Sequence, residues 1–232
     1  MYDSRLNEWF VPKFGPLRFR VAMGMLFLPY TGMCVSFTVM GSLLADDLLW
    51  DRLAAIVIIY MLALGVSAHA LDSIGSRRKP WGSVFSRRSL LMVAVASLAI
   101  AYAIGTYYIV LYVPLLAVIA VLEGFFLLAY NLELFNGRFH NNLWFSISWG
   151  GLPLLAGYIM QTNSVSIPAL IASAATALVA YAEIRVSRPY KELKRSGARD
   201  ARVIRYERIL KALSAGSVGV AVLMVIARLV VH

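Results

Sequence analysis

Four long stretches of this 232-residue chain contain no Asp, Glu, Lys or Arg, and they constrain its fold more than any other feature. They cover residues 21–45, 53–71, 89–122 and 143–182. About 20 apolar residues are enough for a helix to cross the hydrocarbon core of a bilayer. Because 60% of the residues are apolar and only 15% are charged, soluble and disordered classes are excluded. The sequence predicts an all-α, polytopic transmembrane helical bundle.

Two of these stretches are too long for one crossing, so each is expected to contain a turn. Turn-forming residues lie at 105–114 in the third stretch and at 161–164 in the fourth. Pro153 and the pair Gly150-Gly151 predict a kink or a close helix approach. An N-terminal segment (1–20) would precede a single transmembrane domain (21–232). About seven spans are predicted within it, at 21–45, 52–75, 89–106, 113–134, 143–160, 167–187 and 207–230.

Lys and Arg are distributed unevenly between the two sets of connections. With the N-terminus in the cytoplasm, all but two of the 22 cations lie on the cytoplasmic side, and only Arg52 and Arg228 lie opposite. This bias is typical of plasma (inner) membrane proteins that follow the positive-inside rule. The net charge of +10 is then explained by topology and by contact with anionic lipids. No nucleic-acid partner is expected.

Polar residues gather at the cytoplasmic ends of the second, fourth and sixth predicted spans. Ionisable groups inside a membrane are costly and are commonly functional. We expect the three clusters to line a single polar cavity that opens to the cytoplasm. The clusters are His69 and Asp72; Glu123, Tyr130, Asn131 and Arg138; and Glu183, Arg188, Lys191, Glu192 and Lys194.

The sequence leaves a purely structural explanation open for each cluster. Asp72 would pair with Arg77 or Arg78 in the headgroup layer, and His69 would be a hydrogen-bonded packing residue. The cations after the sixth span would face solvent and lipid phosphates. Glu123 lies about two helical turns inside the fourth span, where a carboxyl group has to pair, hydrogen-bond or take up a proton.

Residues 123–161, EGFFLLAYNLELFNGRFHNNLWFSISWGGLPLLAGYIMQ, resemble the central region of the UbiA superfamily of membrane prenyltransferases. There a helix ends in a Tyr-containing stretch, a short basic loop follows, and the next helix carries a G-x-x-P-x-x-x-G-Y motif. The stretch 77–80, RRKP, is similar to the basic stretch after the family's first Asp-rich motif. The resemblance implies a helical bundle around a central cavity. It also implies transfer of a prenyl group from a prenyl diphosphate to a lipid-soluble, membrane-resident acceptor.

The chain departs from the family at both Asp-rich motifs, which hold Mg²⁺ in its members. The first is reduced to Asp72 with His69 nearby, and the second to Glu183 and Glu192 among cations. The resemblance implies that Asp72 and Glu192 would contact Mg²⁺ and that spans one, four and five would hold the isoprenoid tail. Catalytic candidates are Asp72, Glu123, Tyr130 and Asn131, and substrate-binding candidates are His69, Arg78, Lys79, Arg138, Arg188, Lys191 and Lys194.

Two further hypotheses remain open at this point. The missing carboxylates favour a catalytically silent UbiA-like protein, a lipid- or quinone-binding subunit or scaffold with other membrane subunits as partners. A small transporter that uses Glu123 as a proton site is less favoured, because the sequence contains no inverted repeat or paired broken helices. Release of diphosphate from a prenyl diphosphate would separate the enzyme from the silent subunit.

Overall fold

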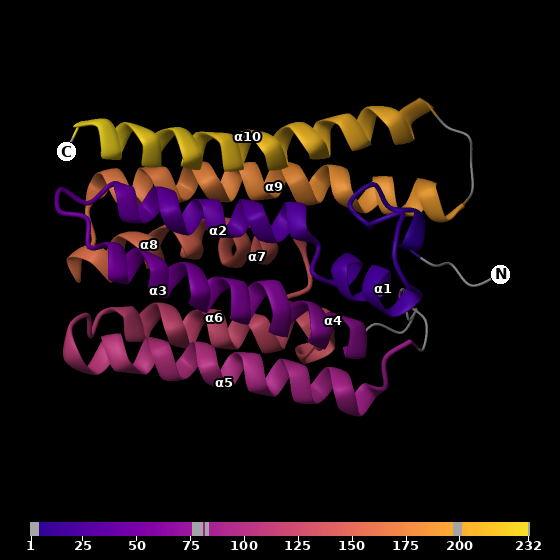
Figure 1. Cartoon of the computed structure of the whole chain (residues 1–232), viewed down its shortest axis with the longest axis horizontal. Helices are drawn as coiled ribbons and strands as arrows, with labels where there is room; N and C mark the ends of the chain where they lie inside the picture. Colours follow the sequence, from indigo (N-terminus) through magenta and orange to yellow (C-terminus); the bar gives the residue numbers. More distant parts are fainter. Residues whose placement is uncertain (1–4, 76–80, 82–83, 197–200, 232) are drawn as a thin grey trace.

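The computed structural model describes residues 5–75, 81, 84–196 and 201–231, and within them it is helical with no strands. The helices run along a common direction, so their connections gather at two ends of the bundle (Figure 1). The helical structure of these residues confirms the predicted all-α class, and six helical stretches in the described residues, against about seven predicted spans, are long and apolar enough to cross a membrane. They are Leu17–Leu43, Trp50–Gly75, Arg87–Leu111, Asn142–Thr162, Ile167–Arg195 and Ala201–Val230.

The fourth predicted span is shorter than the others. It forms α6 (Leu116–Asn131), which has 16 residues. At 1.5 Å per residue its length is about 24 Å, less than the roughly 30 Å of a hydrocarbon core. It packs beside α5 (Arg87–Leu111), as Figure 1 shows.

The turn between α5 and α6 lies later in the chain than Gly105, the first residue at which the sequence indicates a turn. The helix α5 continues past Gly105 to Leu111, so ending the third span near residue 106 was wrong. Gly105 is buried and faces Ile59, with space for an added Cβ at 3.9 Å from the Ile59 side chain. The second predicted turn is confirmed, because the fifth span ends at Thr162 and Asn163 follows in the left-handed region with φ 49°.

The first predicted span is broken near its start. It consists of α1 (Leu17–Met25) and α2 (Leu28–Leu43), and Phe27 between them has φ 43°, in the left-handed region. Such a conformation costs a non-glycine residue of the order of 1 kcal/mol. Contacts of the Phe27 ring with the Phe10 ring (5.1 Å between centroids) and the His69 ring (4.9 Å) hold it in place. The break therefore brings an aromatic ring against the second span.

Two spans contain wide π-helical turns, which are frequent at functional sites. The second span is built from α3 (Trp50–Tyr60), the π segment η2 (Met61–Ala68) and α4 (His69–Gly75); the fifth from α7 (Asn142–Ser146), the π segment η4 (Ile147–Gly151) and α8 (Leu152–Thr162).

The π segment of the fifth span packs tightly on α9 (Ile167–Arg195). Thr176 Oγ1 donates a hydrogen bond to the Gly150 carbonyl (2.9 Å), and Ser173 Oγ donates one to the Gly151 carbonyl (3.0 Å). A Cβ added at Gly150 would lie 2.6 Å from the Thr176 carbonyl oxygen. The close helix approach predicted at Gly150-Gly151 is therefore confirmed.

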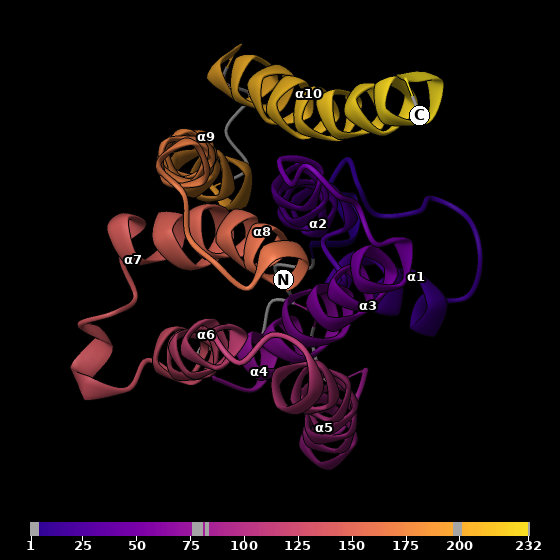
Figure 2. The same cartoon turned by 90° about the vertical axis from the view of Figure 1, so that its left-hand side faces the viewer.

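The helices α2 and α8 form the tightest contact in the middle of the bundle (Figure 2). A Cβ added at Gly157 would collide with the Thr38 carbonyl, and one added at Gly41 would collide with the Leu154 carbonyl. Ser42 Oγ donates a hydrogen bond across this contact to the Gly157 carbonyl (3.1 Å). By contrast, α5 and α10 (Ala201–Val231) lie at the edges of the bundle and are mostly exposed.

The two ends of the bundle differ in charge. One end, here called the cationic end, carries the N-terminal segment, the start of α5, the end of α6, the end of α9 and the start of α10 (Figure 1). The other end carries the three connections at 44–49, 112–115 and 163–166 and the C-terminus of the chain. There Arg52 donates to the Met160 carbonyl (3.2 Å), and Arg228 donates to the Asp46 carbonyl. Successive long helices of the described residues therefore have their connections at alternate ends of the bundle.

Candidate functional site

A polar cavity of about 220 Å³ lies at the cationic end. As the sequence predicts, the ends of the second, fourth and sixth spans meet around it. Of the expected residues, it brings together His69 and Asp72 of α4, Tyr130 and Asn131 of α6, and Glu183, Arg188, Lys191 and Glu192 of α9.

Other parts of the wall were missed by the sequence analysis. Arg5, from the N-terminal segment, lies opposite α9, and its guanidinium is 5.3 Å from the centre of the Phe27 ring. Burial lowers the pKa of Arg5, and the nearby Asp72 carboxylate opposes that shift. The sequence places Arg5 a few residues before the ring pair Trp9 and Phe10, but nothing in this pattern says that the segment folds back over the bundle.

Aromatic rings form the floor of this cavity. His69 packs between Phe27 (4.9 Å between centroids) and Trp149 (5.2 Å), and Trp149 stacks on Phe145 at 5.5 Å with an interplanar angle of 9°. Trp149 belongs to η4, so the π turn presents its ring to the cavity. In the sequence, this part of the wall was indicated only by the Gly150-Gly151 pair beside Trp149, which predicted a kink or a close helix approach.

The cations on the wall are held against rings and carbonyl groups. Lys191 Nζ lies 5.5 Å from the centre of the Phe27 ring and 5.8 Å from that of Tyr30, within the range of cation–π attraction. Arg188 Nη2 donates to the His140 carbonyl at 3.4 Å. These contacts fix the positions of the charged groups while leaving them at the surface of the cavity.

His140 extends the wall on the side of α6. Its ring stacks on the Tyr130 ring at 4.3 Å, and its Nδ1 lies 3.0 Å from the Tyr130 carbonyl oxygen. The side chain of Arg138, two residues earlier, does not border the cavity. Arg78 and Lys79 lie outside the described residues.

An apolar groove of about 270 Å³ adjoins the polar cavity. His69 borders both, and its Nε2 lies 3.3 Å from Thr31 Oγ1. The groove walls come from α1, from the second span and from α5 with the residues before it. Besides His69 they include Ala22, Met25, Leu26, Val66, Ala70, Phe85, Leu90 and Val93.

Lys194 has a different environment from the one expected. Its Nζ lies 3.3 Å from Glu8 Oε2 and 3.9 Å from Glu207 Oε2. Tyr190 donates a hydrogen bond to the same Glu8 oxygen at 2.8 Å. This group, here called the Glu8 cluster, fastens the N-terminal segment that carries Arg5 to α9 and α10.

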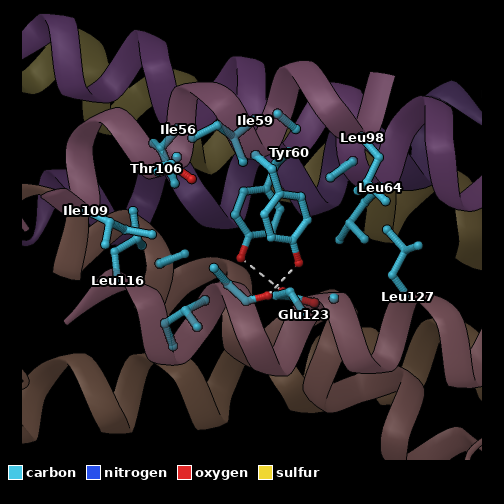
Figure 3. A pocket seen from close by; sticks show the side chains of 18 residues that line it. Ile56, Ile59, Tyr60, Leu64, Leu98, Thr106, Ile109, Leu116, Glu123 and Leu127 are labelled. Carbon is cyan, nitrogen blue, oxygen red and sulfur yellow. Dashed lines mark hydrogen bonds between the residues drawn. The ribbon is translucent and has the colours of Figure 1, made fainter. Parts of the chain in front are cut away.

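Glu123 does not border the polar cavity. It lies in a separate pocket of about 70 Å³ between the second span, α5 and α6, which Figure 3 shows. There Tyr60 donates a hydrogen bond to Glu123 Oε1 at 2.9 Å. The single cavity that we expected from the sequence therefore holds Tyr130 and Asn131 without Glu123.

The carboxylates of the polar cavity do not form a protein-only metal site. Within the described residues no three His, Cys, Asp or Glu side chains are grouped so that they could hold a metal ion. Asp72 and Glu192 both border the cavity, but Glu192 is on its exposed rim. Mg²⁺ bound by two such groups would need phosphate oxygens of a substrate to complete its shell.

Comparisons of the chain with protein-family models, with curated proteins and with solved structures give no match.

Proposed function

We propose that this chain is a UbiA-like integral membrane protein that binds a prenyl diphosphate in the polar cavity and transfers the prenyl group to a membrane-resident acceptor. One observation carries this proposal. His69 borders both the polar cavity and the apolar groove, so the headgroup and the tail of one amphiphile have adjacent binding surfaces. A prenyl diphosphate has these two parts.

The headgroup would be bound by the cations of the cavity. Arg188 and Lys191 lie one turn apart on α9, and Arg5 faces the same space from the N-terminal segment. An arginine fork matches two phosphate oxygens, while a lysine supplies a point charge. The carboxylates Asp72, Glu183 and Glu192 also border the cavity, but with Arg195 its cations outnumber them, four to three, so the lining favours an anionic headgroup.

The tail would lie in the groove formed by the first three spans. Its lining is apolar except for His69 and Ser89. This assignment replaces the expected tail site in spans one, four and five. Each buried methylene group of a prenyl chain contributes roughly 0.8 kcal/mol to binding.

In the proposed transfer, the bond between prenyl C1 and a diphosphate oxygen breaks, and the electron pair leaves with the diphosphate. C1 then bonds to the acceptor, which releases a proton. The cations would stabilise the departing diphosphate, and the stacked rings of Phe145 and Trp149 would face the positive charge that develops at C1. Tyr130 and Asn131 are placed to orient the acceptor.

The test uses purified protein in lipid nanodiscs with farnesyl or geranylgeranyl diphosphate, with Mg²⁺ in one arm and EDTA in the other. We expect binding and diphosphate release by the wild type, and about 100-fold weaker binding by Arg188→Ala/Lys191→Ala, since two charge-assisted contacts are lost. The matched control is Arg185→Ala, a cation on the same helix that is exposed and lies near Tyr181. Equal affinity of the double variant and the control would overturn the proposal.

A second candidate function is favoured by the absence of a three-ligand metal group among the described residues. It is a catalytically silent lipid- or quinone-binding subunit of a membrane complex. Such a protein would bind the amphiphile in the same cavity without releasing diphosphate in either arm, and partner chains would co-purify with it. Turnover by the chain alone excludes this alternative.

We also propose that the cationic end faces the cytoplasm of a plasma (inner) membrane, near anionic lipids, because Lys and Arg concentrate there. Cys34 is the only cysteine and is buried, so Cys34→Ala gives a background for labelling. A membrane-impermeant maleimide should label Arg138→Cys from the cytoplasmic side and Val165→Cys from the opposite side. The reverse labelling pattern would show that the cationic end faces away from the cytoplasm.

A further inference from the structure

The Glu123 pocket is a second cavity, independent of the polar cavity. The two cavities share no lining residue. The Glu123 pocket lies deeper in the bundle along α6, and its walls are aliphatic side chains of the second span, α5 and α6 (Figure 3). Its polar side chains are Tyr60, Tyr102, Thr106 and Glu123.

Only one of the two oxygens of the Glu123 carboxyl group has a hydrogen-bond partner. Oε1 accepts the hydrogen bond from Tyr60, but Oε2 is buried and has no partner. The Tyr102 hydroxyl does not supply one, because it donates to the Ala120 carbonyl at 2.9 Å. Buried polar atoms without partners are rare in folded proteins and require an explanation. A ligand that hydrogen-bonds to Oε2 would supply it.

The pocket can be reached from the lipid. Two of its lining residues, Tyr102 and Thr106, are exposed on α5, a helix that is mostly uncovered in the described structure. Ile109 on the same helix also lines it and is only partly buried. A molecule dissolved in the bilayer would therefore enter between α5 and α6.

The lining restricts the chemistry of the ligand. A primary ammonium group brings three N–H donors, whereas the pocket presents one acceptor without a partner. A water molecule fits by volume and would find polar partners, but it would leave the aliphatic side chains that make up most of the walls without a contact. A neutral molecule with an apolar body and one hydroxyl group satisfies both the carboxyl oxygen and the aliphatic walls. Because the pocket measures only about 70 Å³, its hydroxyl end would lie in the pocket and the rest of its body would extend past Tyr102 and Thr106 into the bilayer.

We infer that the Glu123 pocket is a binding site for a neutral, apolar alcohol from the bilayer, whose hydroxyl group hydrogen-bonds to Glu123 Oε2. This inference does not depend on the proposed prenyl transfer. Binding here involves neither the cations of the polar cavity nor His69.

The test is photolabelling of the full chain in nanodiscs with 3-azioctanol, an eight-carbon alcohol with a photoreactive diazirine, followed by mass spectrometry of the labelled peptides. We expect saturable labelling of the pocket walls. Octan-1-ol should compete about tenfold better than 1-methoxyoctane, which has the same body without a hydroxyl donor.

Two variants separate the pocket from general lipid partitioning. Glu123→Leu removes the carboxyl group, and Gly105→Leu fills the pocket while keeping Glu123, since a Cβ at residue 105 meets only Ile59 at 3.9 Å. Gly216→Leu is the control, because a Cβ there meets nothing within 4 Å. Saturable labelling should be lost in the first two and kept in the control.

Several outcomes would overturn the inference. These are labelling spread evenly over α5 and α10, equal competition by the alcohol and its ether, and undiminished pocket labelling in Gly105→Leu. Circular dichroism and elution as a single species establish that each variant is folded before labelling. Loss of prenyl diphosphate binding in Arg188→Ala/Lys191→Ala, with alcohol labelling retained, would show that the two sites are separate.

Discussion

The polar cavity and the Glu123 pocket place ionisable groups in opposite surroundings. In the polar cavity, Lys191 lies against the rings of Phe27 and Tyr30 and shares the wall with the carboxylates Asp72 and Glu183, so charges of both signs line one space. In the Glu123 pocket one carboxyl group has a single hydrogen-bond partner, Tyr60, and aliphatic walls. The comparison teaches that the first site is suited to charged ligands and the second to neutral ones.

Removing one charge from the polar cavity should have the largest effect. Lys191→Met keeps an apolar stem against Phe27 and Tyr30 but leaves Glu183 and Asp72 less compensated. We expect the free energy of unfolding to fall by about 2 kcal/mol. Binding of a prenyl diphosphate should become weaker by a factor of about 10 to 100. Chemical unfolding in detergent and a binding titration measure the two quantities. Unchanged stability and affinity would contradict the picture of compensated charges.

In the Glu123 pocket, the effect of a substitution on stability should depend on whether Tyr60 and Glu123 are changed singly or together. Tyr60→Phe removes the only hydrogen bond to the Glu123 carboxyl group, with an expected cost of about 1–2 kcal/mol. The double variant Tyr60→Phe/Glu123→Leu replaces both polar groups by apolar ones, so its stability should be close to that of the wild type. A double-mutant cycle of unfolding free energies measures the coupling. Additive losses would show that the two side chains do not interact.

The Glu8 cluster should have a smaller effect, and an indirect one. Glu8→Gln keeps an acceptor for Tyr190 but removes the charge opposite Lys194, for an expected cost of about 1 kcal/mol. Because this cluster fastens the segment that carries Arg5, prenyl diphosphate affinity should fall about threefold, with no change in alcohol labelling of the Glu123 pocket. A fall in that labelling would mean that the two sites are coupled.

The smallest effect is expected for a cation outside both cavities. Arg185 is exposed on α9 and lies 3.4 Å from the Tyr181 hydroxyl, so Arg185→Ala should change the free energy of unfolding by less than about 0.5 kcal/mol. Diphosphate affinity should also stay within about twofold of the wild type. A larger change would show that the charge of the whole cationic end, rather than the cavity wall, governs binding.

The sequence predicts the helical class well because a membrane span needs a long run of apolar residues. It also predicts that polar residues of α4, α6 and α9 meet at one end of the bundle. In a chain that crosses back and forth, the second, fourth and sixth spans all end on the same side. The short-range signals were less accurate. Gly105 suggested a turn, yet α5 continues through it, and the residue lies buried in the wall of the Glu123 pocket.

Other features depend on contacts between residues far apart in the chain. Phe27 breaks the first span because Phe10 and His69 hold its ring, and Arg5 reaches the polar cavity because Glu8 is bound to α9. No local pattern contains these pairings.

The charge-free stretches by themselves determined that this chain forms apolar helices, since backbone groups in hydrocarbon must hydrogen-bond within the helix. The positions of Lys and Arg determined which ends of those helices gather the cations. Only the tertiary structure decided that Glu123 is separate from the polar cavity. A sequence gives the depth of a residue along its helix, whereas helix rotation and packing decide which neighbours it faces.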